Sequence, residues 1–452
     1  MTLHITKTKA EQQLLQQFEA VADQLPGGGW VPAARKAAIG EVATLGLPHR
    51  RIEAWKYTDL RVGVKEAFPP ALPAPVVATS VGAVDLAPLL GAALDALDSI
   101  QLVFVNGTFQ RAEMLPAHAP GKTWHFGPLA KALGDPEYDW LRTLFAARDP
   151  KAAPDPIAAL NAAFMTDGAL LRILPGAEIA VPIHIVLVSD SAGPSRVTTR
   201  HAIEVGAGAK VTLIESHVGR GDAPRQTSSQ THLGVKAGAH VSHIKLLAEG
   251  SQGLHLGTWD VEIGEKSTYR AFQMTAGAGI ARSQLFVRFA GEGATADLSG
   301  VMLARGTGHI DTTLLADHAV PGCTSRELFK SVLRDRGRAV FQGKLLVRPD
   351  AQKTDAKQMA QGLLLSEDAE FISKPELEIY ADDVACGHGS TSGQIDDDLL
   401  FYLRARGIAE ADARAMLVTA FIGEALETIR HEGTRDALAA VAERWLRQAT
   451  AI

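Results

Sequence analysis

A short turn motif recurs at nearly regular intervals through the middle of the chain. Its copies begin at Gly176, Gly208, Gly238, Lys266 and Gly293. Successive copies lie 32, 30, 28 and 27 residues apart, and four of the five read Gly-Ala. Each copy joins two short strand-like runs, and stacked units of this kind bury a continuous core between neighbours. From about Ala169 to Tyr380 we therefore predict a β-helix or similar β-solenoid. A β-sandwich is the competing fold, because regular short strands fit it too.

Helical patterns precede the repeats. Helical spacing of apolar residues predicts a helix over residues 10–25, and a second helix is expected at 32–45. A strand is expected at Ile100–Val105, followed by a hairpin turn at Asn106-Gly107. Residues 137–166 return to helical periodicity.

Helical patterns also follow the repeats. Asp396 and the two aspartates after it suit the N-terminus of a helix, and Gly407 suits its end. Two further helices are predicted, one beginning near Ala411 and one carrying Leu438 and Trp445. The expected organisation is a mostly helical region with a small β element (1–165), a β-helix core (166–385) and a C-terminal helical domain (386–452).

Composition limits the class of protein. The 452 residues are 46% hydrophobic, which is ample for a large core. The net charge of −6 is spread without a basic patch, so nucleic acid is not an expected partner. We expect neither a signal peptide nor a membrane span, because the first residues are polar and the apolar runs are short. The two cysteines, Cys323 and Cys386, suit a reducing cytoplasm, and Cys323 is expected to be structural.

Apparent nucleotide motifs fail on their context. Gly121-Lys122-Thr123 resembles the end of a phosphate loop, but the position five residues earlier is Pro116 instead of glycine. Residues 291–296 match the loose dinucleotide pattern, yet a strand pattern follows where a helix is needed. The sequence also lacks the Gly-x-Ser-x-Gly and His-Glu-x-x-His motifs of serine hydrolases and zinc peptidases.

A thiol and an imidazole stand two residues apart at Cys386 and His388. In an extended segment, positions i and i+2 face the same side, so the two groups could bind one metal centre, with Gly387 and Gly389 leaving room around them. Thiolate and imidazole suit iron or zinc. Two ligands cannot complete a tetrahedral site or hold a cluster that needs four, so such a site would be open or completed by a second chain. The alternative is a buried structural cysteine beside a hydrogen-bonded loop histidine.

The C-terminal half resembles the SufB/SufD family. The resemblance rests on Pro-Glu-Leu-Glu-Ile-Tyr-Ala-Asp-Asp-Val at 375–384, Cys-Gly-His-Gly at 386–389, Gly-Gln-Ile-Asp at 393–396, Phe-Gln-Gly-Lys at 341–344 and Ala-Gln-Lys-Thr-Asp-Ala at 351–356. The segment at 50–60, with Trp55, is similar to an element typical of SufD-type chains. The Cys-x-His-Gly form of the signature also favours that branch. The resemblance extends over the whole chain and is densest from Thr312 to Leu426.

The resemblance implies a fold, partners and a site. It implies a right-handed parallel β-helix between helical ends, and pairing with SufB through the two β-helices. It also implies docking of the ATPase SufC on the C-terminal helices. A nascent iron–sulfur cluster would be shared with SufB, with no cofactor held tightly by this chain alone, and His388 would contribute to the cluster site. The family's usual Lys-Cys-Ser-His is Ala-Cys-Gly-His here, which leaves the role of Cys386 open because no adjacent lysine favours its thiolate. Alone, the chain could pair with itself.

The resemblance therefore predicts a scaffold subunit that is not an enzyme. Helices over residues 396–428 would form the ATPase-docking surface. The residues expected to make that contact are Leu399, Leu400, Leu403, Met416, Leu417 and Phe421. One alternative is a β-helix enzyme acting on carbohydrate through Asp382 and Asp383, although adjacent aspartates point to opposite faces of a strand. Another is a purely architectural interface subunit.

Overall fold

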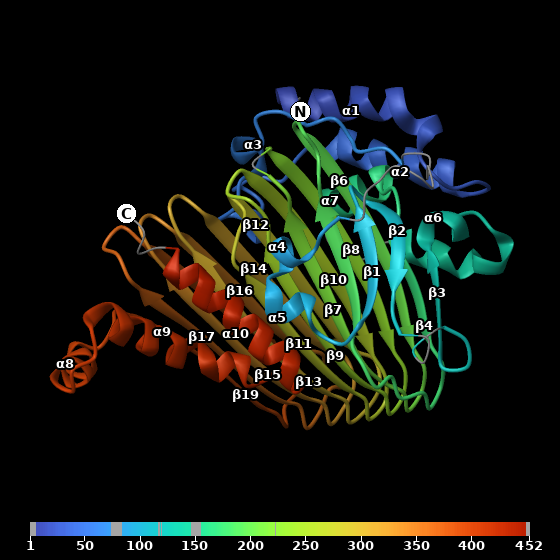
Figure 1. The fold of residues 1–452 in the computed structure, drawn as a ribbon. Coiled ribbons are helices and arrows are strands. Elements are labelled where there is room, and N and C mark those ends of the chain that lie inside the picture. The colour runs from blue at the N-terminus through green and yellow to red at the C-terminus, as the bar shows by residue number, and fades with distance from the viewer. Residues whose placement is uncertain are drawn as a thin grey trace.

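The computed structural model describes residues 6–73, 84–115, 118, 120–145, 155–221 and 223–448. Two stacked sheets of mainly parallel strands form a β-helix, and helices lie on its outer faces (Figure 1). Consecutive strands alternate between the sheets, so each pair of strands makes one rung. This alternation confirms the predicted β-solenoid and excludes the β-sandwich, whose sheets are antiparallel.

The two sheets are built from odd-numbered and even-numbered strands. The sheet of odd-numbered strands from β5 onward is sheet B and that of even-numbered strands is sheet A. Sheet B contains β5 Ile183–Ser189, β7 Lys210–Gly219, β9 His240–Ala248, β11 Thr268–Thr275, β13 Thr295–Ala304, β15 Thr324–Leu333, β17 Asp355–Leu364 and β19 Ala385–Gly393. Sheet A contains β4 Ala169–Ile173, β6 Ser195–Val205, β8 Arg225–Val235, β10 Gly253–Ile263, β12 Ile280–Phe289, β14 His309–His318, β16 Arg338–Val347 and β18 Glu370–Ile379.

The recurring motif forms the turn from sheet A to sheet B. Gly208 has φ +68° and Gly238 has φ +65°, the left-handed conformation that glycine adopts without strain. Lys266 takes the same place with φ +51°. The turns stack through backbone hydrogen bonds, from Gly208 N to Ala237 O and from Gly238 N to Glu265 O. Cys323 follows Gly322 in the equivalent turn and is fully buried, in agreement with a structural role.

Side chains alternate between the lumen of the β-helix and its outer faces. Lumen positions form one long apolar core that includes Leu213, Val241, Tyr269 and Phe341. The outer face of sheet B forms a second core, with residues such as Ile244 packed beneath the C-terminal helices. The outer face of sheet A forms a third with the N-terminal helices. Most strands of the β-helix are therefore covered on both faces.

The N-terminal helices cover sheet A. Their bounds are α1 Lys9–Val21, α2 Val31–Leu45, α3 Leu60–Gly63 and α7 Pro156–Phe164, with short 3₁₀ turns at Ala22–Gln24 and Glu53–Trp55. Thr8 and Glu11 form a capping box at the start of α1. The helical periodicity over 137–166 corresponds to a kinked 3₁₀ segment, Pro136–Phe145, and to α7, and residues 146–154 lie outside the described part of the chain.

The small β element predicted in this region extends the β-helix. β1 Ile100–Val105 pairs in parallel with β5, and the hairpin turn at Asn106-Gly107 leads to β2 Thr108–Glu113, as predicted. β3 Trp124–Pro128 pairs antiparallel with β4 in sheet A. Three short helices complete the region, α4 Ala87–Leu90, α5 Ala92–Asp95 and α6 Leu129–Ala132.

The C-terminal helices begin where the β-helix ends. Their bounds are α8 Asp397–Ala405, α9 Glu410–Leu426 and α10 Glu432–Arg447. Asp396 caps α8, as predicted, by accepting hydrogen bonds from the backbone N–H groups of Asp398 and Leu399. Helices α9 and α10 lie along sheet B, whereas α8 projects beyond the sheets (Figure 1). The last strand ends at Gly393, so the structure places the end of the β-helix after the expected boundary at residue 385. None of the helices in the described ranges has the length and apolar content needed to cross a membrane.

Candidate functional site

The last strand of sheet B carries the Cys-x-His pair. In the register of β19 on β17, Cys386 lies opposite Ala356 and His388 lies opposite Gln358. Ala356 belongs to the lumen core, so both Cys386 and His388 stand on the lumen side of the strand. The structure thus brings the thiol and the imidazole to one face, as their i, i+2 spacing predicts.

This end of the β-helix is open. β18 and β19 are the outermost strands of their sheets, and within the described ranges no strand pairs with their outer edges. His388 is exposed, whereas Cys386 is half-buried against Val347 and Ala351. The next rung would cover both side chains, so their accessibility follows directly from the end of the repeat.

Two buried polar residues continue the column of side chains beneath His388. Gln358 is opposite His388, and Glu327 is opposite Gln358 on β15. Both side chains are only 3% exposed. Neither carboxylate oxygen of Glu327 makes a hydrogen bond, and Oε1 of Gln358 has none either. Burial raises the pKa of Glu327 to about 8, and nearby Ser325 and Arg326 offset only part of this effect. Glu327 therefore holds a proton near neutral pH.

Glu327 and Gln358 were not among the predicted site residues, although the repeat spacing points to both. The spacings from Glu327 to Gln358 and from Gln358 to His388 are 31 and 30 residues, which is the period of the repeat. Residues one period apart stack in the same column of a β-helix. Counting back from His388 by one repeat length leads to Gln358, and counting back by a second leads to Glu327.

The environment of Cys386 does not activate its thiol. Burial raises the pKa of Cys386, and the Ala356 backbone and Lys357 lower it by less. The predicted room beside Gly387 and Gly389 lies on the opposite face of β19. A Cβ atom at Gly389 would come 2.7 Å from Cε of Met359. These glycines therefore make space for side chains of β17 instead of for a ligand beside Cys386.

Asp382 and Asp383, the carboxylates of the alternative carbohydrate-enzyme hypothesis, lie in the loop between β18 and β19. Asp383 forms an ion pair with Lys353, and its backbone N–H donates to Gln352 Oε1 at 2.9 Å. Asp382 is exposed. Asp383 thus helps to hold the last turn of the β-helix, which is a structural use of that carboxylate.

The predicted docking residues differ in how far they are exposed. Leu399 and Met416 are 52% and 50% exposed, but Leu400 is 6% exposed and packs inward. Phe421 is half-buried, with the Lys330 ammonium 4.4 Å from its ring centre. Leu403 and Leu417 are intermediate. The sequence analysis missed two exposed aromatic residues of α8, Phe401 at 74% and Tyr402 at 53%.

Comparisons with known proteins match most of this chain to one family. Residues 187–421 match the family described as "SUF system FeS cluster assembly, SufBD core domain", and residues 8–185 match the "SufBD protein N-terminal region". The iron–sulfur cluster assembly protein SufD of Escherichia coli is 32% identical over 88% of this chain and 89% of its own length.

The chain belongs to the SufBD family. A SufBD family protein of Synechocystis is 30% identical over 87% of this chain and 86% of its own length. SufD of Bacillus subtilis is 22% identical over 97% of this chain and 98% of its own length. The SufBD core match contains Cys386, His388, Gln358 and Glu327, and it extends through most of α9.

The SufBD N-terminal region is fixed to the core by the segment around Trp55. The Arg282 guanidinium lies 3.9 Å from the centre of the buried Trp55 ring. Arg282 also donates to Asp311 at 2.5 Å, and Thr58 donates to the same carboxylate at 2.5 Å. Farther along sheet A, Lys374 pairs with Glu53 at 2.5 Å. The motif therefore anchors the N-terminal helices on the outer face of sheet A.

Proposed function

We propose that this chain is a SufD-type scaffold subunit for iron–sulfur cluster assembly, and that its terminal rung contacts the nascent cluster. The observation that carries the proposal is the position of Cys386 and His388 on the lumen side of an uncovered last strand. The relatives named for cluster assembly support it. The cluster is the cargo of this site, and the chain supplies ligands and shape instead of a catalytic group.

A second chain is needed to complete the site. One thiol and one imidazole are two protein ligands, whereas clusters of the common types take four. The free edges of β18 and β19 present backbone N–H and C=O groups that another chain can pair with. We propose that a SufB-type chain adds its own β-helix at this end and provides the remaining ligands. This arrangement would also bury His388 and Cys386.

His388 is the principal group in this proposal. Its exposed imidazole can ligate iron or exchange a proton with the growing cluster. Glu327 lies two strands below and can release its proton when positive charge gathers at the rung. Cys386 is the secondary group, because burial raises its pKa and so disfavours the thiolate that would bind iron.

Cluster reconstitution under anaerobic conditions tests the proposal. The chain is co-expressed with SufB and SufC partners, and His388→Ala is compared with the unchanged chain by visible absorption. We expect roughly a tenfold lower cluster yield, because a ligand position is lost while the complex still assembles. His240→Ala is the matched control, since His240 is an exposed histidine at the start of β9, remote in sequence from the rung. An unchanged yield in His388→Ala would reduce this chain to an architectural subunit.

The C-terminal helices are the proposed docking surface for the SufC ATPase. Phe401, Tyr402 and Leu399 expose apolar area on α8, and Met416 does so on α9. Exposed aromatic and aliphatic residues on a projecting helix are typical anchors for a partner groove. We expect Phe401→Ala to weaken SufC binding about tenfold, measured by calorimetry, with a change in the free energy of unfolding under about 0.5 kcal/mol. Val62→Ala, at a 61% exposed position near the N-terminus, is the control. Equal binding by both variants would contradict this surface.

A further inference from the structure

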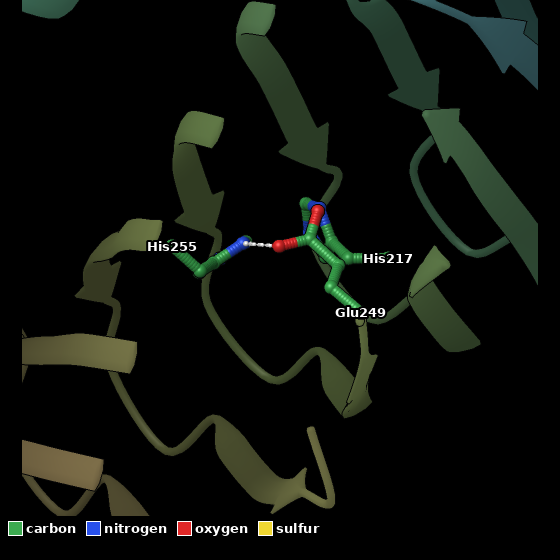
Figure 2. A group of neighbouring side chains, drawn as sticks. All are labelled: His217, Glu249 and His255. Carbon is green, nitrogen blue, oxygen red and sulfur yellow. Dashed lines mark ion pairs between the residues drawn. The ribbon is translucent and has the colours of Figure 1, made fainter. Parts of the chain in front are cut away.

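Three ligand-type side chains converge in the lumen, several rungs away from the terminal rung. His217 extends from β7, Glu249 follows β9 directly and His255 extends from β10 (Figure 2). These three residues are 1%, 5% and 0% exposed. One ligand atom from each residue lies within 4.8 Å of the other two. A cluster of two imidazoles and a carboxylate is therefore built into the closed part of the lumen.

The ligand atoms of this cluster lack hydrogen bonds. Neither ring nitrogen of His217 makes one, and the same is true of Oε2 of Glu249 and Nδ1 of His255. The last two atoms face each other at 3.3 Å, the contact drawn dashed in Figure 2. Buried polar atoms without partners are rare because each costs free energy in the folded protein. A bound ion would take one ring nitrogen of His217 together with Oε2 of Glu249 and Nδ1 of His255.

The other polar atoms of Glu249 and His255 are held in place. Thr227 Oγ1 donates to Oε1 of Glu249 at 2.8 Å. The Lys245 ammonium donates to Nε2 of His255 at 3.1 Å, so Nδ1 carries the ring proton and faces Oε2 of Glu249, and that proton is released when Nδ1 binds an ion. Such outer contacts orient ligands in known metal sites. The nearby Lys245 and Arg225 side chains oppose a cation, whereas the buried Glu215 carboxylate, 3.8 Å from Nε2 of His217, favours one.

We propose that His217, Glu249 and His255 bind one divalent first-row transition-metal ion, such as Zn²⁺ or Fe²⁺. Two imidazoles and one carboxylate are an established ligand set for both ions. With metal–ligand bonds of about 2.1 Å, ligand atoms of a tetrahedral site are about 3.4 Å apart. Nδ1 of His255 and Oε2 of Glu249, 3.3 Å apart, already have this spacing. Three protein ligands leave a fourth position open for water or another small ligand.

A cavity lies beside this cluster, among the surface loops. It has a volume of about 140 Å³ and lies between the β7–β8 and β9–β10 loops. Its lining residues are Ala223, Arg225, Glu249, Gly250, Ser251, Gln252 and Gly253. Glu249 belongs both to the cavity wall and to the cluster. The cluster thus lies beside a cavity, and it has ligands and outer contacts, which a metal site requires.

Cobalt binding tests the proposal independently of cluster assembly. The full chain carrying Cys386→Ser and His388→Ala is used as the parent, because these changes remove the ligands of the terminal rung. Anaerobic titration with Co²⁺ is followed by visible absorption and by metal analysis after dialysis. We expect one bound Co²⁺ per chain, with absorption typical of a site of low coordination number and without a thiolate charge-transfer band.

Two variants of this parent decide the outcome. Glu249→Gln keeps the shape of the side chain, and His217→Ala removes the imidazole whose Nε2 lies 3.8 Å from Glu215. We expect each to weaken Co²⁺ binding at least about tenfold. His201→Ala is the matched control, because it also removes a fully buried lumen imidazole but lies outside the cluster, and it should keep the parent's affinity. No stoichiometric binding by the parent, or equal affinity in Glu249→Gln and His217→Ala, would overturn the proposal.

Discussion

The lumen of the β-helix contains two polar regions that differ in what covers them. In the middle rungs, the lumen residues Glu215, His243 and Trp259 are covered by neighbouring strands and are at most 1% exposed. At the terminal rung, the column Glu327, Gln358 and His388 leads from a buried carboxyl group to an exposed imidazole. The same architecture therefore produces a buried network in the middle rungs and an exposed site at its end. The two differ because no further rung covers β18 and β19.

The buried network is held together by direct hydrogen bonds. Glu215 accepts from Thr231 at 2.8 Å and from Trp259 at 3.0 Å, and it lies 2.9 Å from Nε2 of His243. Burial alone would raise the pKa of Glu215, but its interactions with His217 and His243 outweigh burial and hold the pKa well below its usual range. The open column has no comparable set of bonds. Stability should therefore depend on the first region, and reactivity on the second.

The largest expected effect is that of Glu215→Ala on stability. Removing this carboxylate leaves Thr231, Trp259 and His243 without their partner inside the lumen. We expect the free energy of unfolding to fall by about 3–5 kcal/mol, measured by denaturant unfolding. Ser390→Ala on the exposed rung is the control and should change it by less than about 0.5 kcal/mol. A loss below about 1 kcal/mol for Glu215→Ala would mean that water enters the middle rungs.

A smaller effect is expected from the ionisation of Glu327. Its pKa is about 8 in the folded chain and near 4.5 when unfolded, so between these values only the unfolded chain loses the proton. The free energy of unfolding should then decrease as pH rises, by about 3 kcal/mol between pH 5 and 8 from this group alone. Glu327→Gln cannot ionise and should remove that share of the pH dependence. Identical pH profiles for the two proteins would contradict the buried, protonated state of Glu327.

The sequence predicts those parts of the fold that local chemistry determines. Gly208 and Gly238 mark turns because of their backbone conformation, and Asp396 marks a helix start because its side chain caps α8. The sequence analysis did not find Glu327 and Gln358, because only the register between rungs makes them neighbours of His388. It also grouped Leu400 with Leu399, since an apolar helix does not reveal which side packs inward. The Gly- and Ser-rich β19 lacks an apolar pattern, and the expected boundary at residue 385 therefore precedes it.

The central claim is that a partner chain completes the open rung, and amide hydrogen exchange tests it most directly. Exchange is measured by mass spectrometry on the isolated chain and on its complex with SufB and SufC. The account predicts that residues 385–393 of β19 exchange quickly in the isolated chain and become protected in the complex, because the free strand edge gains hydrogen bonds. Residues 210–219 of β7 should be protected in both. Unchanged exchange of β19 in a fully assembled complex would contradict the account.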